Sequence, residues 1–200
     1  MREIFKQPLK IGLTGGIGAG KTTVSKIFKS LGIPVFNSDE HSKNLLVKNK
    51  GTIKEIIKEF GEAIMEDESI NFPKLSQIIF TDKKKLESIN NILHPKVALL
   101  FSEWLKKKKC KYIIKESALL FESNTASLLD KIILVQSVKK TRIQRVIQRD
   151  NRTQKEVERI INNQIKEKEI INCVDYIINN DKKELLVPKV VKLHQCLSKL

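Results

Sequence analysis

The eight residues from Gly15 to Thr22 have the composition and spacing of a loop that binds phosphate. They read Gly-Gly-Ile-Gly-Ala-Gly-Lys-Thr, matching G-x-x-x-x-G-K-[ST] in full, directly after the apolar run 9–14. Glycine is needed because such a loop wraps around phosphates with its backbone amides pointing inward. By the mechanics of the motif, Lys21 bridges the β- and γ-phosphates and the Thr22 hydroxyl ligates Mg²⁺. The predicted nucleotide contacts are Gly16, Ile17, Gly18, Ala19, Gly20, Lys21, Thr22 and Thr23.

Asp39 is the candidate acid–base residue. The sequence holds no N-K-x-D segment, with which a GTPase would read guanine, so an acceptor and a base remain to be assigned. Asp39 follows the short apolar run Pro34–Phe36, and ligands of open α/β sheets bind at the carboxyl ends of the strands. A carboxylate there can take the proton of an attacking hydroxyl or hold a Mg²⁺-bound water. Capping of a following helix is the alternative interpretation of this residue.

The charge of the chain is strongly positive and unevenly distributed. There are 38 Lys and Arg against 23 Asp and Glu, a net charge of +15. On its own this favours nucleic acid, a membrane surface or a phosphorylated ligand as partner. Lysine is spread over the whole chain, as expected of a solvated surface, whereas arginine is clustered, which is typical of planar, bidentate phosphate recognition. The clustered residues are Arg142, Arg145, Arg149, Arg152 and Arg159.

Nucleic acid and membranes are disfavoured as partners. Aromatic residues make up 6% of the chain and are not interleaved with basic ones, as a single-strand binding groove would require. No apolar run approaches the roughly 20 residues needed to cross a bilayer, and residues 1–8 lack the hydrophobic stretch of a signal peptide. Cys110, Cys173 and Cys196 fit neither a disulfide framework nor zinc-ligand spacing. We therefore expect a cytoplasmic protein with reduced cysteines.

The elements that must position these residues alternate between strands and helices. Residues 40–108 have a helical pattern throughout and no convincing strand, and Thr153 and Glu156 have capping-box spacing. Strands separated by helices predict an α/β fold, a parallel sheet flanked by helices, with a helical insertion after the second strand. The expected strands are 9–14, 34–36, 112–114, 132–135 and 176–178, and the expected helices are 21–31, 139–150, 154–168 and a last one after residue 188.

Together these motifs resemble the dephospho-coenzyme A kinase family over nearly the whole chain. The segment 11–23, Ile-Gly-Leu-Thr-Gly-Gly-Ile-Gly-Ala-Gly-Lys-Thr-Thr, is more specific than the generic phosphate loop. The later matches occur in the order of the family, which is not expected by chance. They are Leu31–Val35 with Asp39, Leu93–Pro95, Leu119–Glu122, Gln144–Arg145 with Gln148–Asp150, Ile161–Gln164 and Asp175–Asn179.

The resemblance implies a kinase that transfers the γ-phosphate of ATP, with Mg²⁺, to the ribose 3′-hydroxyl of dephospho-coenzyme A in the last step of coenzyme A biosynthesis. It also implies three parts. The nucleotide-binding core, of the P-loop NTPase type, would comprise 1–39, 109–141 and 169–200. A helical insertion, 40–108, would bind the coenzyme A moiety, and 142–168 would form a helical lid. A monomer is expected, with an oligomer left open.

The resemblance further assigns catalytic residues. Asp39 would be the base that acts on the 3′-hydroxyl, beside Lys21 in the loop. A lid arginine that meets the ATP phosphates would be Arg145 or Arg149, and the second is favoured for its place in Gln-Arg-Asp. Asn179 would lie near the adenine of ATP.

Substrate contacts are implied for Asp39, His94, Leu120 and Glu122. His94 precedes Pro95, and a capping or core role is the alternative for this pair. A shikimate or nucleoside monophosphate kinase is the nearest rival, disfavoured because no glycine cluster follows the loop and because Leu119–Glu122 matches the coenzyme A type.

Three positions depart from the family pattern. Asn37 stands where the family has the first aspartate of Asp-x-Asp, so that carboxylate cannot be essential, and restoring it is expected to matter little. Phe72, or Lys74, stands in place of an arginine of the substrate domain. Ala118 replaces a proline. The second departure leaves nearby lysines to hold the substrate phosphates as point charges.

Overall fold

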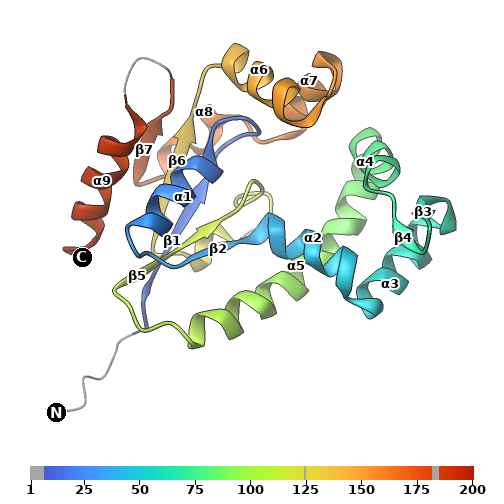
Figure 1. Cartoon of the computed structure of the whole chain (residues 1–200), viewed down its shortest axis with the longest axis horizontal. Coiled ribbons are helices and arrows are strands. Elements are labelled where there is room, and N and C mark those ends of the chain that lie inside the picture. The colour runs from blue at the N-terminus through green and yellow to red at the C-terminus, as the bar shows by residue number, and fades with distance from the viewer. Residues whose placement is uncertain (1–6, 124, 182–184) are drawn as a thin grey trace. The chain divides into compact units, whose positions relative to one another are not determined.

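The computed structural model describes residues 7–123, 125–181 and 185–200 (Figure 1). Two compact units divide the chain. One unit comprises Met1–Asn37 and Leu105–Leu200, and the other comprises Ser38–Trp104. The second unit is thus an insertion between the second and third strands of the first unit's sheet. The prediction about residues 1–6 lies outside the described residues.

The first unit is built on a five-stranded parallel sheet, as the alternation of strands and helices predicts. Its order is β2-β5-β1-β6-β7, and every neighbouring pair is parallel. Parallel strands bring their carboxyl ends to one edge, where the loops that follow them converge. The strands are β1 (Leu9–Thr14), β2 (Val35–Asn37), β5 (Tyr112–Glu116), β6 (Lys131–Gln136) and β7 (Tyr176–Asn179).

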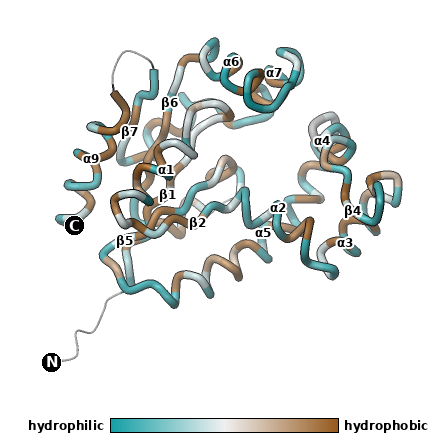
Figure 2. The backbone as a smooth tube through the Cα atoms, viewed as in Figure 1, coloured by the Kyte–Doolittle hydropathy of each residue, from teal (hydrophilic) through white to brown (hydrophobic). Residues whose placement is uncertain are grey.

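Two helices cover one face of this sheet. Helix α1 (Lys21–Ser30) contributes Val24 and Phe28 to the core, and α9 (Leu186–Leu197) contributes Val190 and Leu193. These side chains pack with sheet residues that alternate along the strands, because successive strand residues point to opposite faces. Hydrophobic colour runs along the strands in Figure 2. Burial of each large apolar side chain contributes about 1.5–3 kcal/mol, so this layer fixes the two elements, β1 and α1, that the loop joins.

Two helices were expected after β6, at 139–150 and 154–168. The second of them is shorter than expected. Helix α6 (Lys139–Asp150) is as predicted, and α7 (Gln154–Asn163) begins with the expected capping box of Thr153 and Glu156. The helix then ends, since Gln164 has an extended backbone and α8 (Glu167–Ile170) is a separate short turn. Asn162 and Asn163 have low helix propensity, which favours an end at this point. Two 3₁₀ turns, η2 (Ala126–Leu128) and η3 (Ile171–Cys173), complete the connections.

The second unit is helical, with a small hairpin that the sequence did not predict. Strands β3 (Met65–Glu66) and β4 (Ser69–Ile70) pair antiparallel across Asp67 and Glu68, which both have positive φ. Two-residue strands leave no periodicity to detect, which explains the wrong prediction. The remaining elements are α2 (Ser38–Lys48), α3 (Lys50–Phe60), η1 (Glu62–Ile64), α4 (Phe72–Thr81) and α5 (Lys83–Lys106).

No helix begins at Pro95, contrary to the capping role offered as one alternative for the His94–Pro95 pair. Pro95 lies inside the continuous helix α5. Proline there removes one backbone hydrogen bond of the helix, so a capping advantage cannot explain its presence. The side chain of His94 is half-buried within the same helix.

Candidate active site

The loop between β1 and α1 is shaped around the Lys21 ammonium. Nζ of Lys21 donates to the carbonyl oxygens of Gly15 at 2.7 Å and Gly16 at 3.4 Å, and the side chain is buried. Gly20 precedes α1 in the left-handed conformation, with φ of 102°. Helix α1 therefore begins directly at the loop, and its N-terminus adds partial positive charge there. Lysine and helix dipole together make this loop a site for a polyanion.

A buried carboxylate that the sequence analysis missed organises the other side of the loop. Glu116, at the end of β5, is 2% exposed and accepts hydrogen bonds from Thr22 Oγ1 at 3.0 Å and Ser25 Oγ at 2.6 Å. Asn37 Nδ2 donates to the same carboxylate at 3.3 Å. The contact follows from the register, since Asn37 and Glu116 pair across β2 and β5 and share one face of the sheet. The signal in the sequence was an acidic residue within three positions of an apolar run, the same signal that singled out Asp39.

Of the two candidate lid arginines, Arg145 contacts the loop and Arg149 does not. Arg145 Nη1 donates to the carbonyl of Gly18 at 3.3 Å, and its Nη2 donates to the carbonyl of Asn180 at 2.9 Å. Arg149 instead bonds to Asp150 at 2.7 Å, with its side chain 61% exposed. The hydrogen bond from Arg149 lowers the pKa of Asp150, with the charge of the guanidinium acting in the same direction. In this conformation the geometry favours Arg145 as a residue of the site.

Asn180, rather than Asn179, reaches the loop from the end of β7. Its Nδ2 donates to the carbonyl of Ala19 at 2.8 Å, and its backbone amide donates to Gln136 at 2.8 Å. The predicted residue, Asn179, is exposed, and its carbonyl accepts from Lys189 Nζ at 2.7 Å. Both asparagines stand at the carboxyl edge of the sheet. The pattern Asn-Asn gave no means of choosing between them.

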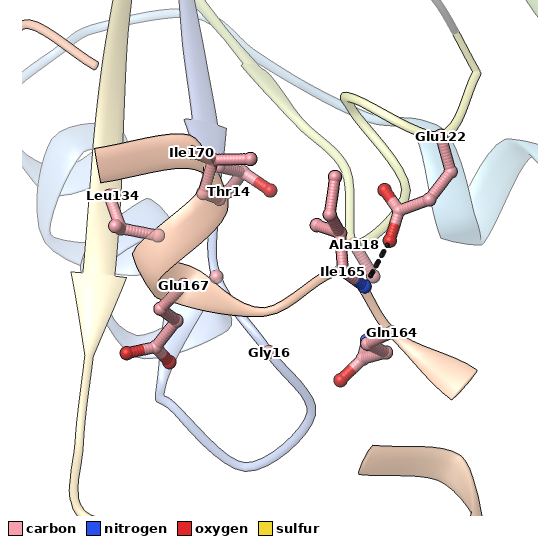
Figure 3. A pocket seen from close by; sticks show the side chains of 10 residues that line it. Thr14, Gly16, Ala118, Glu122, Leu134, Gln164, Ile165, Glu167 and Ile170 are labelled. Carbon is pink, nitrogen blue, oxygen red and sulfur yellow. Dashed lines mark hydrogen bonds between the residues drawn. The ribbon is translucent and has the colours of Figure 1, made fainter. Parts of the chain in front are cut away.

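A pocket lies beside the base of the loop (Figure 3). The predicted residue Glu122 lines it, and its Oε1 accepts from the backbone amide of Ile165 at 3.2 Å. Leu120, also predicted to contact substrate, is fully buried and lies against Gly12 of β1. Its part is therefore in the packing under the loop. The residues around the pocket are Thr14, Gly15, Gly16, Ala118, Glu122, Leu134, Gln164, Ile165, Glu167 and Ile170.

The predicted residues of the second unit are distributed over two helices. Asp39 is the second residue of α2, within its first turn, where a negative charge is favoured by the helix dipole. His94 lies in the middle of α5. Lys43 Nζ is 5.4 Å from the centre of the Phe72 ring, a cation–π distance. A cation thus stands next to the position where an arginine was expected.

Two features are absent from the described residues. Nowhere in the described part of the chain do three or more His, Cys, Asp or Glu side chains gather as ligands of a metal ion. Among the same residues, no helix is both long enough and apolar enough to cross a membrane.

A parallel sheet with a complete phosphate loop between its β1 strand and α1 helix defines the class of P-loop nucleotide-binding proteins, and solved structures share this fold. A crystal structure of TT1252 from Thermus thermophilus superposes with a TM-score of 0.84 at 26% identity, covering 96% of this chain and 98% of that one. A dephospho-CoA kinase from Campylobacter jejuni and a shikimate kinase from Acinetobacter baumannii share the fold at TM-scores of 0.63 and 0.55, with 24% and 16% identity and 98% of this chain covered in each case.

Sequence comparison identifies the family within this class. The family model of dephospho-CoA kinase matches residues 9–185. The dephospho-CoA kinase of Fusobacterium nucleatum is 41% identical over 182 residues, which cover 90% of this chain and 94% of the relative. That of Bacteroides fragilis is 33% identical, covering 92% and 91%. The chain belongs to the dephospho-CoA kinase family, enzymes that phosphorylate dephospho-CoA with ATP in the last step of coenzyme A biosynthesis.

Proposed function

We propose that this chain transfers the γ-phosphate of ATP to the ribose 3′-hydroxyl of dephospho-CoA, giving coenzyme A and ADP. The observation that carries the proposal is the loop itself, in which Lys21 lies in the curve of the glycines and Thr22 is held by Glu116. Little covalent chemistry is required of a protein in phosphoryl transfer, and catalysis comes from positioning and from charge neutralisation. The residues below are assigned on that basis.

Lys21 and the loop amides are proposed to bind the triphosphate. Lys21 now donates to loop carbonyls, which orients its ammonium toward the curve of the loop. The Thr22 hydroxyl and the Glu116 carboxylate offer the hard oxygen atoms that Mg²⁺ prefers, so these residues fit that ion. Thr22 would hold it directly, and Glu116 would orient Thr22. When bound, Mg²⁺ neutralises charge that develops on the phosphate oxygens.

Asp39 is proposed as the base that accepts the proton of the 3′-hydroxyl. Its support is its place in the chain, two residues after the end of β2, where Asn37 already bonds to Glu116 beside the loop. A carboxylate needs hydrogen-bond reach to the hydroxyl in the closed complex, and such contacts tighten only when substrate is bound.

Closure of residues 142–168 as a lid is proposed to exclude water, because water would otherwise compete with the 3′-hydroxyl for the γ-phosphate. Arg145 and Arg149 would carry the positive charge of this lid. The hydrogen bond from Arg145 to Gly18 supports Arg145 as the arginine nearer to the phosphates. Arg149 would require release from Asp150 in order to reach a phosphate.

The 40–108 insertion is proposed to bind the coenzyme A moiety. Lys43, next to Phe72, and Lys74, at the start of α4, would supply point charges for its phosphates in place of the family's arginine. His94 and Glu122 are retained as substrate contacts, and Asn179 as a neighbour of the adenine of ATP. A monomer that works in the cytoplasm is the simplest setting for these two small-molecule substrates.

The test uses ATP labelled in its γ-phosphate, with dephospho-CoA and with its 3′-deoxy analogue as acceptors. The proposal predicts label in coenzyme A and none in the analogue. Label transferred equally to the analogue would contradict a 3′-specific transfer. Lys21→Ala is the matched control, because it removes a cation aimed at phosphate without opening the hydrophobic core, and it should abolish transfer in a folded protein.

A further inference from the structure

Side chains from two separate lid segments bind the backbone of the same residue of the phosphate loop, Ile17. The backbone amide of Ile17 donates to Gln164 Oε1 at 2.8 Å, and the carbonyl of Ile17 accepts from Arg142 Nε at 2.9 Å. Arg142 comes from α6, and Gln164 comes from the extended residue after α7. Both polar groups of Ile17 are thus satisfied by side chains that lie 125 and 147 residues away in the chain.

These two side chains are themselves fixed. Arg142 Nη2 donates to Gln164 Oε1 at 3.4 Å, and its Nη1 donates to Glu167 at 3.1 Å. Gln136 Nε2 holds the other oxygen of Glu167 at 3.1 Å. Arg142 is 8% exposed, and a buried guanidinium with three directed bonds is a rigid fork. Burial lowers the pKa of Arg142, and the charge of Glu167 opposes that shift.

The loop is shaped to receive this fork. A Cβ atom added to Gly16 would fall 1.9 Å from Arg142 Nη2, so any side chain at this position would displace the guanidinium. Gly18, with φ of 75°, approaches the backbone of the same arginine, and a Cβ there would lie 2.5 Å from its carbonyl oxygen. Two loop glycines are therefore required by contact with Arg142, in addition to any need for phosphate access.

We infer that Arg142 and Gln164 are positioning residues that hold the tip of the phosphate loop in its nucleotide-binding shape, and so couple the order of the lid to nucleotide affinity. The inference rests on the proposed function only in taking the loop as the nucleotide site. A loop of glycines loses much conformational freedom when it is ordered, and contacts made beforehand reduce that cost on binding. Because the pair acts through the backbone of Ile17, it affects ATP and ADP alike.

The test compares the dissociation constants of ATP and ADP for Gln164→Ala and Arg142→Ala with those of the native chain, by calorimetry. We expect both nucleotides to bind about tenfold more weakly, the change that loss of one or two hydrogen bonds produces. The Michaelis constant for dephospho-CoA should stay within about twofold, since uniform loss of nucleotide binding leaves the acceptor site intact. Gln154→Ala is the matched control, because Gln154 is an exposed glutamine at the start of α7 that bonds to Glu158 on the same helix.

Three outcomes would overturn the inference. Unchanged affinities would show that the contacts are incidental, and tighter binding would show that Gln164 blocks an amide needed by phosphate. A loss of affinity for ATP several times larger than that for ADP would mean direct contact with the γ-phosphate.

Arg142→Lys tests whether the geometry or only the charge of Arg142 is needed, because a lysine ammonium keeps the charge but cannot make the three directed bonds of the guanidinium. The inference predicts that this variant binds nucleotide as weakly as Arg142→Ala, and near-native binding would contradict it.

A readout without nucleotide keeps the test independent of activity and of the proposed function. Hydrogen exchange of the Ile17 amide should be slow in the native chain and clearly faster in Gln164→Ala, because the acceptor of that amide is lost. The melting temperature identifies any variant that has failed to fold. Equal exchange rates in two folded proteins would contradict the inference even if the chain had a different substrate.

Discussion

At the scale of single residues, Asp39 is the assignment that a conservative change tests best. Asp39→Asn keeps size and hydrogen bonding but cannot accept a proton, so turnover should fall by about 10²–10⁴-fold with little change in the Michaelis constants. A capping role at the start of α2 predicts almost no change, since asparagine caps nearly as well, and a dipole role predicts unchanged turnover with a loss of only about 0.3–1 kcal/mol in stability. Steady-state rates and the melting temperature of the variant decide between the two. An active, equally stable Asp39→Asn protein would remove the base from the proposed mechanism.

Glu116 is expected to affect activity by orienting the Thr22 hydroxyl. Glu116→Gln removes the charge that orients the hydroxyl, and loss of such an outer partner lowers activity by about 10–100-fold. The contact of Glu116 with Asn37 decides the effect of a change at Asn37. The family pattern alone suggests that Asn37→Asp has little effect on activity. It would, however, place a second carboxylate about 3.3 Å from Glu116, so we predict that this variant loses activity and stability.

The double variant Asn37→Asp with Glu116→Gln restores a single negative charge in the same cluster. It should recover part of the activity that each single change loses, which is measured as a positive coupling in a double-mutant cycle. If the losses of activity in the two single variants simply add in the double variant, the charge of Glu116 is not what supports activity.

At the scale of elements, the loss of turnover on replacing an arginine of α6 should be larger for an arginine that contacts the loop than for one that does not. Arg145→Ala should lower turnover more than Arg149→Ala, because Arg145 already contacts Gly18 whereas Arg149 is paired with Asp150. Lys107→Ala, a change at an exposed lysine of the run 106–109, is the control and should have no effect. Turnover at saturating ATP is the measurement. Equal, small effects at all three positions would show that clustering of arginine in this segment is incidental.

The start of α7 depends on its capping box. Thr153→Ala removes the acceptor for the Glu156 amide, at a cost of about 1 kcal/mol in the stability of this helix. Hydrogen bonds from the Thr153 backbone and side chain lower the pKa of Glu156, so its support is present above the unfolded pKa and is lost as the pH falls through the lower folded value. Thermal melts of Thr153→Ala and the native chain should therefore differ at every pH, and by more at neutral pH than in acid, where the variant lacks only the bond to the Glu156 amide. A constant difference would contradict the role of the charged carboxylate.

Much of this arrangement could be predicted from local patterns. The loop 15–22 was predictable because its glycines and lysine each have a fixed task, and the strands because they are apolar and separated by helices. The contacts of Glu116 and of Arg142 were not, since they join residues up to 125 positions apart and depend on strand register and side-chain direction. The contact of Gln164 could not be predicted either, because no local pattern indicates that its side chain accepts a hydrogen bond from the Ile17 amide.

At the scale of the whole molecule, the net charge of +15 does not require a nucleic-acid partner. Several of the clustered basic groups are engaged within the protein. Arg142 and Arg145 bind the loop, and Arg149 is paired with Asp150. Family membership accounts for the phosphate-binding character of the site, since both substrates are anions. Most of the lysines lie on the surface, where they are solvated, whereas Lys21 and Lys115 are buried.

The central claim is that this phosphate loop serves dephospho-CoA as acceptor. One coupled assay of ADP formation tests it most directly, with ATP and Mg²⁺ and with dephospho-CoA, adenosine monophosphate or shikimate offered in turn. The proposed function predicts a kcat/KM for dephospho-CoA at least about 10³-fold above that for either of the others, because binding energy from the rest of the molecule is used to position the 3′-hydroxyl. A comparable or higher kcat/KM with adenosine monophosphate or shikimate would contradict it.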